Sequence, residues 1–172
     1  MRIRRIFVGI AIAMLAPLIA PSAAAAAPSN RELELRDKCD SASFNAVFGP
    51  GFCTTNGGVE LDEFLADLND GGSSHWWIRQ RETELQQGGS VSAKNVGGIV
   101  HTFTEVSAFG KGCIPQFNVA VPETRDNCDF ARFGATVVPQ GQTSAPEKPA
   151  VGVHKFQCLI HPWMRTTVTV KR

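Results

Sequence analysis

The feature that most restricts the fold is a series of short runs over residues 73–172, in which polar and apolar side chains alternate. An alternation with a period of two is typical of strands that bury one face. Gly, Pro and Asn separate the runs, as in the turn signal Val96-Gly97-Gly98. Many short strands with turns between them predict an all-β sandwich or barrel with antiparallel pairing. The expected strands are Trp76–Gln80, Ser90–Asn95, Ile99–Val106, Thr136–Val138, Val151–Cys158 and Thr166–Lys171.

Residues 28–72 follow a different pattern, that of two short helices. Asp40 is placed to cap a helix that runs to Phe48, and Gly49 and Pro50 follow it. Further along, Leu61, Phe64, Leu65 and Leu68 recur at helical spacing before Gly71-Gly72. We therefore predict a short helical N-terminal extension at 28–72, followed by the sandwich domain at 73–172.

Residues 1–27 have the composition of an export signal. Three arginines (Arg2, Arg4 and Arg5) precede the apolar run Ile6–Ala20, and small residues follow at Ala23–Ala27. The apolar run is shorter than the ~20 residues that span a bilayer, which favours cleavage over an uncleaved membrane anchor, the alternative. We expect a signal peptide and a secreted or periplasmic protein without stable membrane insertion, with the export route left open.

The charge of the chain argues against a nucleic-acid partner. The sequence contains 17 Lys and Arg and 16 Asp and Glu. Three of the basic residues lie in the predicted signal, so the remaining chain is slightly acidic and offers no basic surface. Its length suits one domain, which we expect to be a monomer.

The five cysteines are an odd number for a protein exported to an oxidising compartment. Local pairing favours Cys39 with Cys53 and Cys113 with Cys128, each pair separated by turn-rich sequence. Cys158 is then unpaired. An inert buried thiol and an intermolecular disulfide are the alternatives to a functional role.

Cys158 begins the motif Cys158-Leu159-Ile160-His161-Pro162-Trp163-Met164, which is C-x-x-H-x-x-M between two expected strands. A thiolate, an imidazole and a thioether on one loop suit copper, which must be stable as both Cu(I) and Cu(II). Zinc rarely takes a thioether, and an iron–sulfur cluster needs more thiolates than are free. Met164 is also the only methionine after Met14. The motif therefore predicts a copper site with Cys158, His161 and Met164 as ligands.

A fourth ligand must come from elsewhere in the chain. His101 is the preferred candidate because it shares a predicted strand face with Ile99 and Phe103. His75 and His154 are the alternatives. An enzyme would need an open copper position, which Met164 argues against, and no second metal cluster is visible in the sequence. We therefore expect no catalytic residues and no enzyme activity.

The segments that carry these ligands resemble those of a known family. Gly152–Met164, G-V-H-K-F-Q-C-L-I-H-P-W-M, resembles the ligand loop of the plastocyanin-like cupredoxins, or type 1 blue copper proteins, with the spacing found in amicyanin. Gly98–Thr104 resembles the segment that carries their first histidine ligand. The resemblance covers residues 73–172 and leaves the extension and the 107–135 insertion outside. It implies a Greek-key β-sandwich, one copper ion held by His101, Cys158, His161 and Met164, and electron transfer between redox partner proteins.

Two positions depart from the family pattern. Many cupredoxins have Asn directly after the first histidine, where its side chain ties the ligand strands together, and this chain has Thr102. Many also have Pro before the second histidine, and this chain has Ile160. The Ile160 amide, which proline lacks, is expected to donate to the Cys158 sulfur and lower the reduction potential.

The resemblance also implies that the edge of His161 reaches the surface within an apolar patch, built here by Pro162 and Trp163. Ordinary core packing is the alternative role for Trp163. The function expected overall is single-electron transfer. Copper storage or delivery, and a metal-free structural domain, are the alternatives.

Overall fold

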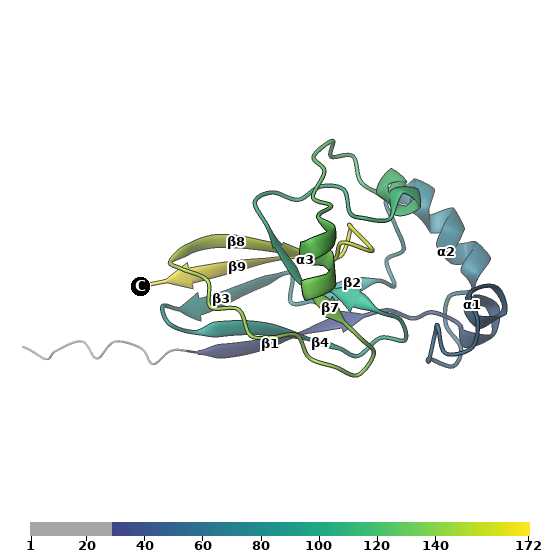
Figure 1. Cartoon of the computed structure of the whole chain (residues 1–172), viewed down its shortest axis with the longest axis horizontal. Coiled ribbons are helices and arrows are strands. Elements are labelled where there is room, and N and C mark those ends of the chain that lie inside the picture. Colours follow the sequence, from purple (N-terminus) through teal and green to yellow (C-terminus); the bar gives the residue numbers. More distant parts are fainter. Residues whose placement is uncertain (1–28) are drawn as a thin grey trace, which may run out of the picture.

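The computed structural model describes residues 29–172 (Figure 1). The predicted signal peptide, residues 1–27, lies outside the described residues. The strands are β1 (Asn30–Arg36), β2 (Trp77–Arg79), β3 (Glu82–Gln86), β4 (Ser90–Asn95), β5 (His101–Thr102), β6 (Thr104–Val106), β7 (Val137–Val138), β8 (Gly152–Gln157) and β9 (Arg165–Lys171). The helices are α1 (Ser41–Phe48), α2 (Leu61–Asp67) and α3 (Phe130–Ala135), with the 3-10 turns η1 (Leu68–Asp70) and η2 (Pro115–Ala120).

One sheet has the order β2-β1-β4. β1 pairs antiparallel with β2 and parallel with β4. Residues 142–147 cover the outer edge of β4 through backbone hydrogen bonds. Asn95 N donates to Gln142 O, Val91 N donates to Glu147 O, and Glu147 N donates to Val91 O. The free edge of β4 is thus closed by irregular chain, which protects it from pairing with other molecules.

The second sheet has the order β3-β9-β8-β6. β8 pairs antiparallel with both β9 and β6, whereas β3 is parallel to β9. A short separate pair joins β5 to β7. The chain crosses repeatedly between the sheets, giving the expected all-β Greek-key sandwich, but two of its strand pairs are parallel rather than antiparallel.

The core lies between the two sheets. The first sheet contributes Leu33, Leu35 and Val91, and the second contributes Phe156 and Val168, all of them at most 1% exposed. Because side chains of a strand alternate between faces, this buried set follows directly from the period-two pattern of the sequence. Burial of these apolar side chains is the main driving force that holds the sheets together.

The segment predicted as a helical extension contains both helices but begins with a strand. Asp40 Oδ1 accepts a hydrogen bond from Ser43 N and caps α1, as predicted, and Gly71 ends η1 in a left-handed conformation. β1, however, lies at the centre of the first sheet. The sequence Asn30–Arg36 offers only Leu33 and Leu35, alternating with charged residues, as a signal for this strand, which was not predicted.

α1 and α2 lie at one end of the sandwich, opposite the C-terminus, whereas α3 lies beside the middle of the sandwich (Figure 1). Phe44 of α1 and Phe64 of α2 are each 2% exposed and pack against the buried ring of Trp76. The 107–135 insertion adds η2 and α3, neither of which was predicted. Among residues 29–172, no helix combines the length and the apolar character that crossing a bilayer requires.

Both predicted disulfides are present. Cys39 bonds to Cys53 within the extension, and Cys113 bonds to Cys128 within the insertion. Cys158 is the free cysteine of the described chain and is fully buried. Each disulfide thus crosslinks one of the two segments that lie outside the cupredoxin resemblance, the extension and the insertion.

Candidate metal centre

Three potential metal ligands meet at the helix-bearing end of the sandwich. The ligand atoms of His101, Cys158 and His161 all lie within 4.8 Å of one another, and all three residues are buried. His101 begins β5, whereas Cys158 and His161 lie on the loop between β8 and β9. Folding thus brings together residues that are 57 positions apart in the chain.

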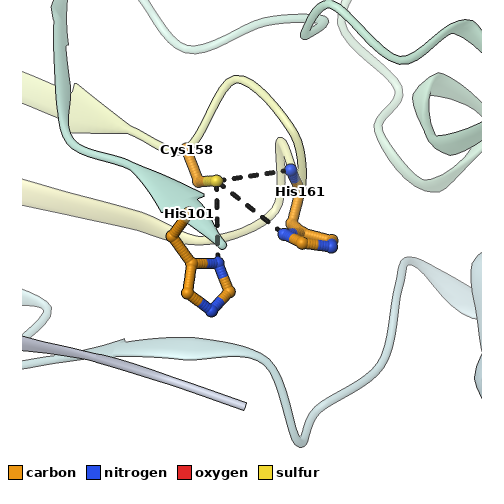
Figure 2. Close-up of side chains that lie close together, drawn as sticks. All are labelled: His101, Cys158 and His161. Atoms are coloured by element: carbon orange, nitrogen blue, oxygen red, sulfur yellow. Dashed lines mark hydrogen bonds between the residues drawn. The ribbon is translucent and has the colours of Figure 1, made fainter. Parts of the chain in front are cut away.

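The ring nitrogens of the two histidines face the same sulfur. Cys158 Sγ lies 3.9 Å from His101 Nδ1 and 3.8 Å from His161 Nδ1 (Figure 2). Metal–sulfur and metal–nitrogen bonds of about 2.3 and 2.0 Å, at angles of about 120°, would place these atoms roughly 3.7 Å apart. The spacing therefore fits one metal ion held between a sulfur and two imidazoles.

The loop that carries Cys158 and His161 is closed by its own backbone. Cys158 N donates to Met164 O at 3.0 Å, and Met164 N donates to His161 O at 2.9 Å. Met164 is fully buried and belongs to the same core cluster as Cys158. Met164 thus lies in the core at the end of the loop that carries Cys158 and His161, and its role as a ligand stays a prediction.

Thr102 ties the two ligand segments together. Its Oγ1 accepts a hydrogen bond of 2.7 Å from Leu159 N, next to Cys158, and both residues are fully buried. Its own amide donates to Cys158 Sγ at 3.4 Å. Thr102 therefore makes the link between strands that the resemblance associates with Asn at this position.

The amides that donate to the sulfur differ from the one expected. Among the described residues, Cys158 Sγ accepts from Thr102 N and from His161 N, at 3.4 and 3.5 Å. The hypothesis that the Ile160 amide donates to the sulfur is wrong in this geometry. The tight loop turns the following amide, that of His161, toward the sulfur instead (Figure 2).

His161 does not reach the surface. Only 1% of it is exposed, because its ring stacks on Phe117 at 5.5 Å and is surrounded by Phe64, Trp76 and Trp163. The expectation of an exposed edge within a patch of Pro162 and Trp163 is therefore wrong. It failed because the helical extension and the insertion, which lie outside the family pattern, supply Phe64 and Phe117 to cover this ring.

Beside these rings lies a wholly apolar groove of about 340 Å³. Its walls come from α1, α2, the insertion, the residue before His161, the segment after α1 and the two residues before β5. Three of its side chains are exposed, Phe48 at 51%, Leu65 at 47% and Phe52 at 37%. The lining residues are Phe44, Phe48, Phe52, Leu61, Phe64, Leu65, Ile99, Val100, Ile114, Phe117, Phe133 and Ile160.

The electrostatics of the cluster favour a thiolate. Burial raises the pKa of the Cys158 thiol, but its hydrogen bonds with His101 and His161 and their positive charge outweigh burial and hold that pKa well below its usual range. Burial lowers the pKa of His101, yet Asp37 and Cys158 raise it to about 9. For His161, burial dominates and the pKa is lowered. Since metals bind the thiolate form, this environment suits metal binding.

The two alternative histidines lie outside the cluster. Nδ1 of His154 bonds to Glu105 Oε1 at 2.7 Å, and its Nε2 donates to Ala150 O. His75 is half-buried near the start of β2. Neither belongs to the group of potential ligands in the described chain. Sequence reasoning missed Asp37, whose carboxylate bonds to His101 Nε2 at 2.9 Å.

No family model and no curated protein matches the sequence. Three of the solved structures that the fold resembles are a purple cupredoxin from Nitrosopumilus maritimus, a mutant plastocyanin of fern and a mutant of amicyanin in its Cu(I) form. The purple cupredoxin is 13% identical and the alignment covers 81% of this chain and 98% of that one, with a TM-score of 0.43.

For the fern plastocyanin the identity is 15%, the coverage 82% and 100%, and the TM-score 0.42. For amicyanin the identity is 16%, the coverage 55% and 73%, and the TM-score 0.37. All three are cupredoxins. At these TM-scores the likenesses add nothing to what the sheet order and the geometry of the cluster show by themselves.

Proposed function

We propose that this chain binds one copper ion through His101, Cys158, His161 and Met164 and transfers single electrons between redox partner proteins. The observation that carries the proposal is the convergence of three buried donor atoms within 4.8 Å of one another. Two imidazoles and a thiolate with a weak thioether form the donor set typical of blue copper electron-transfer sites. Bound there, copper would supply the exchange between Cu(I) and Cu(II).

The protein's part is to hold the donors still. Backbone hydrogen bonds close the loop from Cys158 to Met164, and the Thr102 hydroxyl fixes that loop to β5. Donors that keep their positions in both oxidation states reduce the rearrangement that accompanies each electron transfer. The rigid, buried surroundings of the cluster support an electron carrier.

Burial also bears on the alternative of copper delivery. A delivery protein must release its ion to a partner, which requires ligands that a partner can reach. His161 is 1% exposed, and Cys158 and Met164 are fully buried. This arrangement favours retention of the ion over its release.

We propose export as well, to the periplasm or the extracellular space. Two disulfides in the described chain support this proposal, because such bridges persist in oxidising compartments. Purification of the secreted form and sequencing of its N-terminus would test it. Recovery of the protein only from the cytosol would contradict it.

The copper assignment is tested by the visible spectrum and voltammetry of the purified protein after addition of one equivalent of Cu(II). We expect an intense blue absorption and a reversible one-electron wave. Both should be lost in Cys158→Ser and in His101→Gln. His154→Gln is the matched control, since it removes a carboxylate-bonded histidine outside the cluster and should keep the colour. A colourless wild-type protein would contradict the assignment.

A further inference from the structure

Behind His101 lies a buried carboxylate that the ligand set does not include. Asp37 directly follows β1, and its side chain is fully buried. Its Oδ2 lies 2.9 Å from His101 Nε2, whereas Cys158 faces the other nitrogen of that ring, Nδ1. A buried carboxylate is rare unless it is paired, so its position calls for a physical reason.

The hydrogen bonds of Asp37 favour its ionised form. Oδ1 accepts from Gly98 N at 2.9 Å and from Cys39 N at 3.3 Å. Oδ2 accepts from Ile99 N at 3.2 Å and lies 2.9 Å from His101 Nε2. Three backbone amides thus donate to the two oxygens, and an ionised carboxylate accepts from all of them and from an imidazole N–H as well. Asp37 therefore carries a negative charge beside His101.

The surrounding chain is built to admit this carboxylate. A Cβ at Gly97 would overlap Asp37 Oδ2, and a Cβ at Gly98 would lie 2.6 Å from Cys39 Sγ. The turn is held by Asn95, whose side chain accepts from Gly97 N and donates to Ile99 O. Only glycine at these two positions lets the turn approach closely enough to donate to Asp37.

The contact with Asp37 also decides how His101 presents its ring. A proton on Nε2 that is donated to the carboxylate leaves the Nδ1 lone pair directed at the cluster (Figure 2). His161 differs, since its ring lies against the aromatic side chains of Phe117 and Trp163. The two imidazoles are thus unequal, with an anion behind His101 and apolar rings around His161.

We propose that Asp37 is a positioning residue that fixes the tautomer of His101 and, through its buried negative charge, lowers the reduction potential of the copper bound there. The proposal rests on the proposed copper function. A hydrogen bond to a carboxylate strengthens an imidazole as a donor, and a nearby anion favours the more highly charged Cu(II) over Cu(I). Both effects stabilise the oxidised state.

The test compares the reduction potential of wild-type protein with that of Asp37→Asn. Loss of such a partner typically weakens metal binding about 10- to 100-fold. If the loss of affinity falls mainly on Cu(II), the reduction potential rises by about 59 mV for each tenfold decrease in Cu(II) affinity relative to Cu(I) affinity. Glu105→Gln is the matched control, because it also removes a carboxylate paired with a histidine, His154, away from the cluster. We expect the control to move the potential by much less.

The outcomes separate this inference from the copper assignment. A wild-type protein that binds no copper would defeat the assignment itself. A blue wild-type protein whose Asp37→Asn variant has an equal or lower potential, or one shifted no more than Glu105→Gln, would overturn the role of Asp37 and leave the assignment intact. A rise of at least about tenfold in the ratio of Cu(I) affinity to Cu(II) affinity supports the role.

A second measurement uses only the wild-type protein, so it can be made even if Asp37→Asn does not fold. In the diamagnetic Cu(I) form of the wild-type protein, nuclear magnetic resonance of the 15N-labelled rings locates each imidazole proton. We expect the His101 proton on Nε2, with a resonance downfield of that of His161 because it is donated to a carboxylate. Equal shifts for the two rings would overturn the role of Asp37, whereas a His101 proton on Nδ1 would contradict ligation of copper by His101 itself.

Discussion

The hydroxyl of Thr102 is a small group on which the geometry of the ligand loop depends, and its removal gives a sharp prediction. Thr102→Val deletes the acceptor of the Leu159 amide and keeps a side chain of nearly the same shape. Thr102 and Leu159 are both fully buried, so no water replaces the lost hydroxyl. The Leu159 amide, which donated at 2.7 Å, is left without that partner.

The expected loss of stability follows from that amide. An unsatisfied buried donor costs about 1–3 kcal/mol. Thr104 Oγ1 also donates to Thr102, but it keeps its 2.6 Å contact with Thr136 Oγ1, so little is added to the cost. We therefore expect the free energy of unfolding to fall by about 1–3 kcal/mol.

Urea unfolding, followed by the fluorescence of the three tryptophans, of which Trp76 is buried, measures this loss. Thr143→Val is the matched control, since Thr143 is exposed and its hydroxyl makes only a 3.4 Å contact with Glu32. The control should change stability by less than about 0.5 kcal/mol. A Thr102→Val variant as stable as that control would refute the view that this hydroxyl ties the ligand segments together.

Three further predictions concern the N-terminal extension and the contact between His154 and Glu105. Phe64→Ala removes a ring that is 2% exposed and should lower the free energy of unfolding by about 3–5 kcal/mol. The control Phe130→Ala, at a ring that is 77% exposed, should change it by less than about 0.5 kcal/mol, and similar losses of stability in the two variants would contradict the packing described. Replacing both cysteines of the Cys39–Cys53 disulfide with alanine should cost about 3 kcal/mol in urea unfolding, and no loss would contradict its role in stapling the extension. Burial lowers the pKa of His154, but the bonds to Glu105 and a backbone carbonyl raise it overall, so its stabilising effect is full below the unfolded pKa of about 6.5 and is lost as the pH rises through the higher folded value. His154→Gln should thus destabilise more at about pH 5.5 than at about pH 9, and an equal loss at both would refute that sign.

Much of the site was predictable because its signals are local. Cys158, His161 and Met164 stand on one loop with a fixed spacing, and the structure places the first two within reach of one ion. His101 was selected from strand alternation, since it shares the predicted inward face of Ile99 and Phe103. Pairing of the other four cysteines left Cys158 free, which the structure confirms.

What was missed depends on contacts between distant segments. Asp37 stands 64 residues before His101, and an isolated Asp after a short strand carries no pattern that would indicate a buried partner. β1 was missed because two leucines alternating with charged residues are a weak strand signal in a segment dominated by helical spacing. The covering of His161 by Phe117 likewise arises from tertiary packing of the insertion, which no local rule anticipates.

The most direct test of the central claim is X-ray absorption at the copper edge of the copper-loaded protein. Coordination by Cys158, His101 and His161 predicts one short sulfur neighbour and two imidazole nitrogens around each copper, with the sulfur absent in Cys158→Ser. A copper environment without a short sulfur in the wild-type protein, or one unchanged by Cys158→Ser, would contradict the site.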